Sequence, residues 1–175
     1  MENLTGGTPP VRYLPCVVPC KLYFGVVSDT HNVLRPEVIA SLRGCDYILH
    51  AGDLCCEELL MQLKALGKVC AVRGNNDLGA WAAELKVVER LKLDGLQIVM
   101  CHEFIDMPEA SEADIIINGH SHRYRCEKKG RQWFLNPGSC GRRRFNYPLT
   151  WMILITDKGE LTIERHEIKD IEKKQ

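Results

Sequence analysis

The chain has 175 residues, of which 45% are hydrophobic and 26% are charged. This composition is typical of one globular domain and excludes a disordered or fibrous chain. Its 23 Lys and Arg balance 23 Asp and Glu, which argues against a protein whose main task is to neutralise a long nucleic acid. No apolar run reaches the roughly 18–20 residues of a membrane-spanning helix.

The first 20 residues predict an irregular leader. Gly and Pro dominate this stretch without hydrophobic periodicity, and the acidic Glu2 followed by four prolines does not fit a signal peptide. The nine cysteines of the chain form no evenly spaced framework, so we interpret them as reduced thiols of a cytoplasmic protein. We therefore expect a leader over 1–20 and a single domain over 21–175.

The first half of this domain alternates short apolar runs with amphipathic stretches. Strands are predicted over 22–27, 46–51 and 68–72, because each run is short and almost wholly apolar. Helices are predicted over 36–43 and 57–66, where apolar residues recur at helical spacing and a glycine follows. Strands that alternate with helices of this length imply right-handed crossovers and a largely parallel sheet.

The second half is predicted to be mainly antiparallel. Hairpins are expected over 87–100, 124–135 and 151–163, because each contains a central turn with a glycine between two apolar runs. A further buried strand is predicted over 114–118. Since no linker or repeat separates the halves, we expect them to share one core.

Five of the predicted strands end in loops that carry possible metal ligands. In open α/β sheets the loops at the carboxyl ends of strands converge at one edge. Each short motif alone is an ordinary polar turn, but together they predict a metal site. Imidazole, carboxylate and amide groups without a thiolate suit first-row divalent cations. The side chains expected to meet are Asp29, His31, Asp53, Asn75, His102, His120 and His122.

The order of these motifs resembles the calcineurin-like metallophosphoesterases, in particular their small, capless bacterial and archaeal phosphodiesterase branch. The resemblance covers about residues 21–168, and the Asn-Pro-Gly-Ser segment at 136–139 is similar to a loop of that branch. It implies an α/β fold, a four-layer αββα sandwich with mixed β-sheets. The motifs are Asp-x-His at 29–31, Gly-Asp at 52–53, Gly-Asn-x-Asp at 74–77, His102 and Gly-His-x-His at 119–122.

The resemblance also implies two divalent metal ions per chain, bridged by Asp53. A bridging carboxylate can hold two cations about 3.5–4 Å apart, the separation that two-metal phosphoryl transfer needs. We expect manganese, with nickel, iron, cobalt and zinc left open because ligand softness alone does not choose among them. The implied ligand sets are Asp29, His31 and His122 for one ion and Asn75, His102 and His120 for the other. Together with Asp53, these ligands are also the predicted catalytic residues.

The reaction that this site implies is hydrolysis of a small phosphodiester, with the metals neutralising the phosphate and activating a hydroxide. One position departs from the family: many members have a His directly after the Asn of the third motif, where this chain has Asn76. A neutral amide supplies no proton, so we expect modest rates and a preference for good leaving groups. Asn76, Asn32 and Arg73 are the candidate substrate-binding residues.

Other functions stay open as alternatives. One is a non-catalytic or weakly active metal-binding scaffold, like the similar subunit of the eukaryotic retromer coat, although retention of all seven ligand-type residues argues against it. Another is a phosphomonoesterase, against which Asn76 and the lack of cap segments count. A nuclease is supported only by the basic run Arg142–Arg144, so a nucleic acid partner is not our main expectation.

Three further expectations concern residues and surfaces outside this set. His50 is expected to pack in the core rather than bind metal, and Cys55, Cys56 and Cys101 are expected to pack beside the ligands without coordinating. No membrane partner is expected. A homodimer is also predicted, based on the apolar character of the second half.

Overall fold

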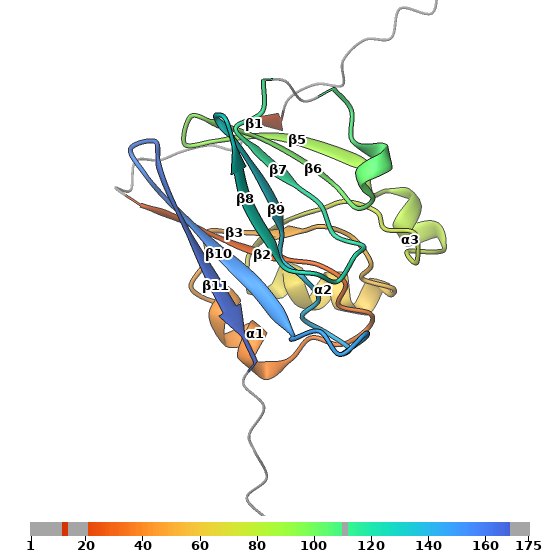
Figure 1. The fold of residues 1–175 in the computed structure, drawn as a ribbon. Coiled ribbons are helices and arrows are strands. Elements are labelled where there is room, and N and C mark those ends of the chain that lie inside the picture. Colours follow the sequence, from red (N-terminus) through yellow and green to blue (C-terminus); the bar gives the residue numbers. More distant parts are fainter. Residues whose placement is uncertain (1–11, 14–20, 110–111, 169–175) are drawn as a thin grey trace, which may run out of the picture.

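Two β-sheets pack face to face in the computed structural model, which describes residues 12–13, 21–109 and 112–168 (Figure 1). The five-stranded sheet has the order β11 (Glu160–Glu167), β10 (Thr150–Asp157), β2 (Leu22–Val27), β3 (Tyr47–His50) and β4 (Lys68–Ala71). The six-stranded sheet has the order β1 (Arg12–Tyr13), β5 (Val88–Leu93), β6 (Leu96–Cys101), β7 (Ile115–Ile117), β9 (Gln132–Asn136) and β8 (Arg125–Lys129).

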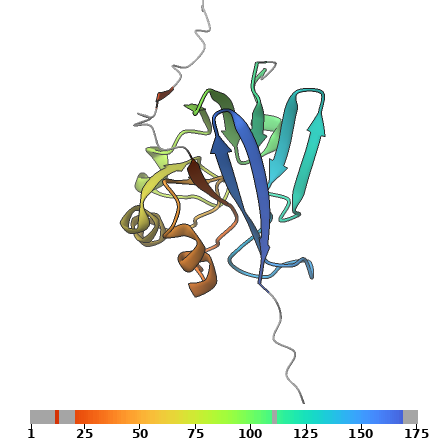
Figure 2. The same ribbon diagram turned by 90° about the vertical axis from the view of Figure 1, so that its left-hand side faces the viewer.

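The parallel part of the five-stranded sheet follows the predicted alternation of strands and helices. Strands β2, β3 and β4 pair in parallel and are joined by α1 (Pro36–Leu42) and α2 (Glu57–Leu66). Pro36 starts α1 at a position where its missing N–H costs nothing. Figure 2 shows both helices on one side of this sheet, with the six-stranded sheet on its other side.

The core between the sheets consists of side chains from both. Phe24 of β2, Leu49 of β3, Met100 of β6 and Ile117 of β7 belong to one buried cluster. A second cluster lies between the outer face of the five-stranded sheet and the helices, and it includes Leu42 of α1 and Leu63 of α2. Burial of apolar surface on both faces explains why these strands are almost continuously hydrophobic.

The three predicted hairpins are confirmed as the antiparallel pairs β5/β6, β8/β9 and β10/β11. The strand expected over 114–118 is β7, which pairs in parallel with both β6 and β9. The six-stranded sheet is therefore mixed, because β7 is reached through the longer connection 102–114 rather than through a tight turn.

The α/β sandwich with mixed sheets is confirmed, and its second outer layer is thin. The connection between β6 and β7 contains the 3₁₀ turn η1 (Phe104–Asp106) and Ala113, which forms a small buried cluster with Val99 of β6 and Ile116 of β7. The remaining helix, α3 (Ala80–Ala83), spans four residues. No helix in the described part of the chain is long and apolar enough to cross a membrane.

Strand β1 differs from the irregular structure expected over 1–20. Arg12 and Tyr13 pair in parallel with Leu91 and Lys92 of β5. An edge strand such as β5 presents backbone N–H and C=O groups that an extended segment can satisfy. The other residues of 1–20, with their predicted leader, lie outside the described residues.

Candidate metal centre

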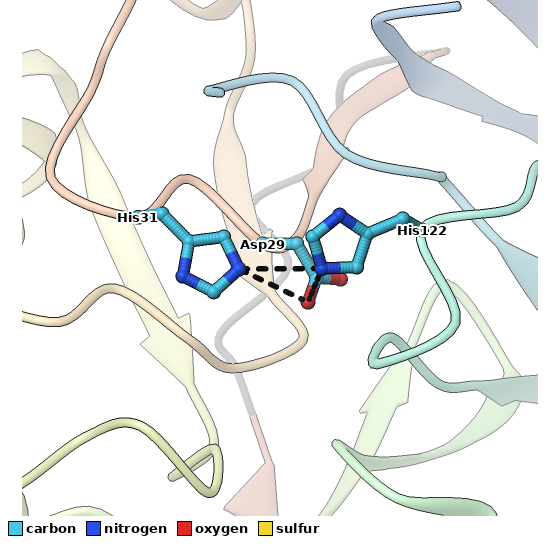
Figure 3. A group of neighbouring side chains, drawn as sticks. All are labelled: Asp29, His31 and His122. Carbon is cyan, nitrogen blue, oxygen red and sulfur yellow. Dashed lines mark hydrogen bonds and ion pairs between the residues drawn. The ribbon is translucent and has the colours of Figure 1, made fainter. Parts of the chain in front are cut away.

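The loops that follow β2, β3, β4, β6 and β7 bring the seven predicted ligand residues together. In the first group, the loop after β2 supplies Asp29 and His31, and the loop after β7 supplies His122 (Figure 3). His122 Nε2 lies 3.2 Å from Asp29 Oδ1 and 3.2 Å from His31 Nε2, and His31 Nε2 lies 3.9 Å from Asp29 Oδ1. The three side chains thus direct their ligand atoms at one point. We call them the buried group, because their exposed fractions are only 0 to 4%.

The second group consists of Asn75 after β4, His102 after β6 and His120 after β7. Asn75 Oδ1 lies 3.0 Å from His102 Nε2 and 3.1 Å from His120 Nδ1. Asn75 and His120 are exposed, whereas His102 is buried. We call these three residues the open group.

Asp53 lies between the two groups. Its Oδ2 is 3.7 Å from His31 Nε2 in the buried group, and its Oδ1 is 3.5 Å from His102 Nε2 in the open group. Ligand atoms of Asp29, Asp53 and His102 also lie within 4.8 Å of one another. One carboxylate therefore faces both groups.

The donor set fits a bound cation. His102 Nδ1 lies 2.7 Å from the backbone oxygen of Ala51, an acceptor that requires a proton on Nδ1. In the neutral ring Nε2 then carries a lone pair facing the oxygens of Asn75 and Asp53, and such an arrangement needs a proton or a cation between the atoms. In the buried group, Asp29 Oδ1 is a buried atom without a hydrogen-bond partner among the described residues, which is costly unless a positive charge compensates it.

The ionisable groups of the centre shift one another's pKa values because they lie close together. Burial raises the pKa of Asp53, but the hydrogen bond and charge of His102, together with two hydrogen bonds from Asn76, hold it well below its ordinary value. Burial likewise opposes protonation of His102, yet the nearby Asp53 and Asp29 raise its pKa to about 9. Burial and then the positive charge of Arg144 lower the pKa of His31. The centre is therefore an anionic site that stabilises positive charge near Asp53.

Five of the seven residues have left-handed backbone conformations. The φ angles are 52° at Asp29, 45° at His31, 62° at Asp53, 66° at His120 and 56° at His122. Each such conformation of a non-glycine residue costs of order 1–3 kcal/mol and persists only where surrounding contacts enforce it. This clustering of strain is typical of a functional site.

Backbone hydrogen bonds enforce these conformations. The N–H of Asp29 donates to Gly52 O at 3.0 Å, and the N–H of His31 donates to Asp53 O at 3.1 Å. The N–H of His120 donates to Asp29 Oδ2 at 3.1 Å. Gly74 has no room for a side chain, because a Cβ there would overlap Asp53 Oδ1 and the Asp53 nitrogen. The loops after β2, β3, β4 and β7 are thus locked to one another.

Two residues and one segment support the site but were not predicted as part of it. Asp77 accepts hydrogen bonds from the backbone N–H groups of Asp53, Cys55 and Gly74 at 2.7 to 3.0 Å. The position of Asp77 in the Gly-Asn-x-Asp motif is the sequence feature that could have identified its role. Cys55 places its sulfur 3.2 Å from His31 Nδ1, and burial raises the pKa of this thiol to about 12. The protonated thiol orients the imidazole from the side away from Asp29.

The third supporting element is the Asn-Pro-Gly-Ser segment, to which the sequence assigned no role. The side chain of Asn136 donates to Gly119 O at 2.7 Å, just before His120. The hydroxyl of Ser139 donates to Asp29 O at 2.8 Å. This segment therefore fixes the loops that carry the buried group.

The three candidate substrate-binding residues occupy different positions. Asn76 donates from its side-chain Nδ2 to Asp53 Oδ2 at 2.6 Å and from its backbone N–H to Asp53 Oδ1 at 2.8 Å, so its amide orients the carboxylate. Arg73 lines a cavity of about 200 Å³ together with Asn75, His102, Glu103 and Asp106. Asn32 is exposed, and its N–H donates to Leu54 O at 3.0 Å.

His50 packs beneath the buried group. The N–H of Gly52 donates to His50 Nδ1 at 3.2 Å, and His50 Nε2 lies 3.0 Å from the Thr30 hydroxyl. Since Nδ1 accepts, the ring proton resides on Nε2. Complete burial lowers the pKa of His50 to about 3. His50 is therefore a neutral core residue, in agreement with the expectation from the sequence.

The fold and the motifs can be compared with known proteins. Residues 22–159 of this chain match the family model of the calcineurin-like phosphoesterase superfamily domain. A probable metallophosphoesterase of Methanothermobacter thermautotrophicus is 30% identical over 158 residues, which cover 82% of this chain and 91% of that protein. A phosphodiesterase of Methanocaldococcus jannaschii is 26% identical over 157 residues, covering 78% of this chain and 94% of that protein.

Among solved structures, vacuolar protein sorting 29 from Cryptosporidium parvum has a TM-score of 0.71 at 18% identity. The alignment covers 87% of this chain and all of that one, and at this identity the likeness concerns the fold alone. The matched domain, by contrast, spans most of this chain and includes all seven residues of the candidate metal centre. The chain therefore belongs to the calcineurin-like phosphoesterase superfamily.

Proposed function

We propose that this protein is a divalent-metal-dependent phosphodiesterase that hydrolyses a small phosphodiester. The observation that carries the proposal is the Asp53 carboxylate, which directs one oxygen toward each group of ligands. The similarity to a relative named phosphodiesterase supports the choice of substrate class.

In this proposal two cations are held by the buried group and the open group, with Asp53 shared between them. When bound, such cations would supply positive charge for the phosphate oxygens and would lower the pKa of a water molecule. We expect manganese, with nickel, iron, cobalt and zinc as alternatives, since the imidazole, carboxylate and amide ligands suit all of them.

The chain's own residues have separate tasks in this reaction. Asn76 holds the Asp53 carboxylate by two hydrogen bonds, so it positions a ligand rather than protonating a leaving group. Arg73 lies beside the open group, where its positive charge can orient a phosphate oxygen. Because Asn76 cannot donate a proton as an acid, the reaction should favour esters with good leaving groups.

We also propose that residues 21–175 form a single domain, because strands from both halves contribute to one buried cluster. The cytoplasmic location and the homodimer expected from the sequence stay predictions. Sedimentation of the purified full chain tests the homodimer directly.

The function is tested by hydrolysis of bis(p-nitrophenyl) phosphate and p-nitrophenyl phosphate. Chelator-treated protein receives manganese, nickel, zinc or magnesium in turn, and we expect metal-dependent turnover of the diester in preference to the monoester. Asp53→Asn should reduce kcat by about 10³-fold or more, since it removes a buried charge shared by both groups, and should lower the number of bound ions. Asp46→Asn is the matched control, because Asp46 is exposed at the opposite end of β3.

Full activity of Asp53→Asn would refute the assignment of the centre. If the wild-type protein binds about two ions but hydrolyses neither ester with any metal, the phosphodiesterase proposal fails. The metal-binding scaffold would then be the function to pursue, by capture of partner proteins with the metal-loaded chain.

A further inference from the structure

An exposed aromatic side chain lies beside the buried group of the metal centre. Phe145, in the loop before β10, is 71% exposed. Its ring centroid is 5.9 Å from that of His122, with the rings at 83°, and 6.0 Å from that of Tyr147. A side chain with this much exposure contributes little to the core, so most of the Phe145 ring surface is accessible beside the buried group.

The backbone at Phe145 is unfavourable for this residue type. Phe145 and Asn146 have φ angles of 54° and 56°, and the N–H of Tyr147 donates to Arg144 O at 3.1 Å. Two left-handed central residues closed by this hydrogen bond are the pattern of a type I′ turn, which favours Gly, Asn and Asp. Asn146 suits the turn, whereas a bulky ring at 145 is an outlier. The chain therefore retains an exposed phenylalanine at a position where asparagine would be more stable.

The loop is fixed next to the metal centre. Arg35 Nε donates to Gly141 O at 2.8 Å, and the Ser139 hydroxyl that contacts Asp29 also lies 3.3 Å from Arg142 O. These bonds fix the segment that leads to Phe145, and the ring contacts with His122 and Tyr147 place its mostly exposed ring beside the centre.

Positive charge accompanies these rings. Arg144 directly precedes Phe145 in the turn and is exposed. At the outer side, the Arg123 guanidinium lies 5.5 Å from the ring centroid of Tyr147. An anion that carries a flat aromatic group meets both requirements of this surface, stacking on a ring and attraction to a guanidinium.

Building on the proposed function, we propose that Phe145 and Tyr147 form a binding subsite for an aromatic ester group of the substrate. The substrate class is therefore an aromatic phosphodiester, in which a nucleoside or an aryl group lies on Phe145 while the phosphate occupies the metal centre. Arg144 contributes charge attraction for the phosphate at the same rim.

The subsite is tested by isothermal titration calorimetry, which measures the binding of a ligand without requiring its hydrolysis. The full, manganese-loaded chain is titrated with thymidine 5′-monophosphate, phenyl phosphate and methyl phosphate. Stacking of a base on an aromatic side chain contributes roughly 1–3 kcal/mol, so we expect about tenfold tighter binding of an aromatic ester than of methyl phosphate. If both aromatic esters bind more tightly than methyl phosphate, the subsite accepts any aryl group. If only the thymidine ester does, the substrate class is restricted to nucleoside esters.

Two substitutions at Phe145 separate binding from stability. Phe145→Asn should raise the thermal midpoint, because asparagine suits the left-handed turn, and should abolish the aromatic preference. Phe145→Trp should retain the preference. Phe104→Ala is the matched control, since Phe104 is also a largely exposed phenylalanine, on η1, at 54%, and it should leave the preference as in the wild type.

The proposal is overturned if the wild-type chain binds all three ligands equally, if Phe145→Asn keeps the preference, or if Phe104→Ala removes it. Because these measurements involve no hydrolysis, they fail independently of the proposed function. A chain that prefers aromatic esters but cleaves no diester would retain the subsite and lose the phosphodiesterase assignment.

Discussion

The buried and open groups of the candidate metal centre contain similar ligand-type side chains in different surroundings. Asp29 in the buried group is 0% exposed and has an oxygen without a hydrogen-bond partner among the described residues. In the open group the oxygen ligand is the neutral amide of Asn75, which is exposed together with His120. A buried charge needs a compensating charge, whereas water can solvate an exposed amide. We infer that the buried group depends more strongly on its cation.

The largest expected effect comes from removing one ligand of each group. Asp29→Asn should lower activity by about 10³-fold and release one cation, because a buried ionic partner is worth roughly 3–5 kcal/mol. Asn75→Ala should weaken binding of the other cation, and added manganese should restore much of its activity, since the open group is accessible to water and ions. Activity and bound metal are measured across a manganese titration.

Equal loss in the two variants, without rescue of either by manganese, would contradict the difference between the groups. It would mean that the cations bind as one unit through Asp53, with no separate contribution from burial.

A smaller effect is expected from Gly74→Ala, which tests the support beneath Asp53. The added Cβ would overlap the Asp53 carboxylate and backbone, so we expect a loss of stability of about 1–3 kcal/mol. A shifted carboxylate should also reduce kcat by about tenfold or more, since misplacement by 1 Å can cost that much. Urea unfolding and diester hydrolysis measure the two effects.

Gly44→Ala is the matched control, because a Cβ at Gly44 meets nothing within 4 Å. Its stability should change by less than about 0.5 kcal/mol. If Gly74→Ala behaves like this control, the centre does not need the close approach of Gly74, after β4, to Asp53, after β3.

The smallest effect concerns His50, which supports the buried group through Thr30. Its pKa falls from 6.5 to about 3 on folding because of burial. Between these values the unfolded chain binds more protons, so the free energy of unfolding decreases as pH falls from 6.5 toward 3. His50→Gln removes this contribution, which approaches about 1.4 kcal/mol per pH unit.

The measurement is urea unfolding of chelator-treated wild-type and His50→Gln proteins between pH 7 and pH 5. Contributions from titrating groups that do not interact with His50 are present in both proteins and cancel in the difference. The difference in the free energy of unfolding between the wild type and His50→Gln should decrease toward lower pH. If the two proteins show parallel curves of this free energy against pH, His50 does not have the low pKa that its burial predicts.

Most of the secondary structure could be predicted because it depends on local patterns. The 22–27 strand and the 57–66 helix have the observed bounds, since apolar periodicity and the following glycine act within a few residues. The pairing of β7 with β6 and β9 was not predicted, because parallel pairing joins segments that are distant in sequence. Strand β1 was missed because its partner β5 lies about 80 positions away.

By itself, the sequence determined the type and order of the candidate ligands, because parallel strands place the loops at their carboxyl ends at one edge. Only the tertiary structure decided which side chains face one another: His31 meets His122 across 91 positions, Asn76 turns to Asp53, and Asp77, Cys55 and Asn136 support the loops. Phe145 reaches His122 in the same way. These contacts depend on packing between distant loops, whereas a sequence pattern records only local periodicity and residue chemistry.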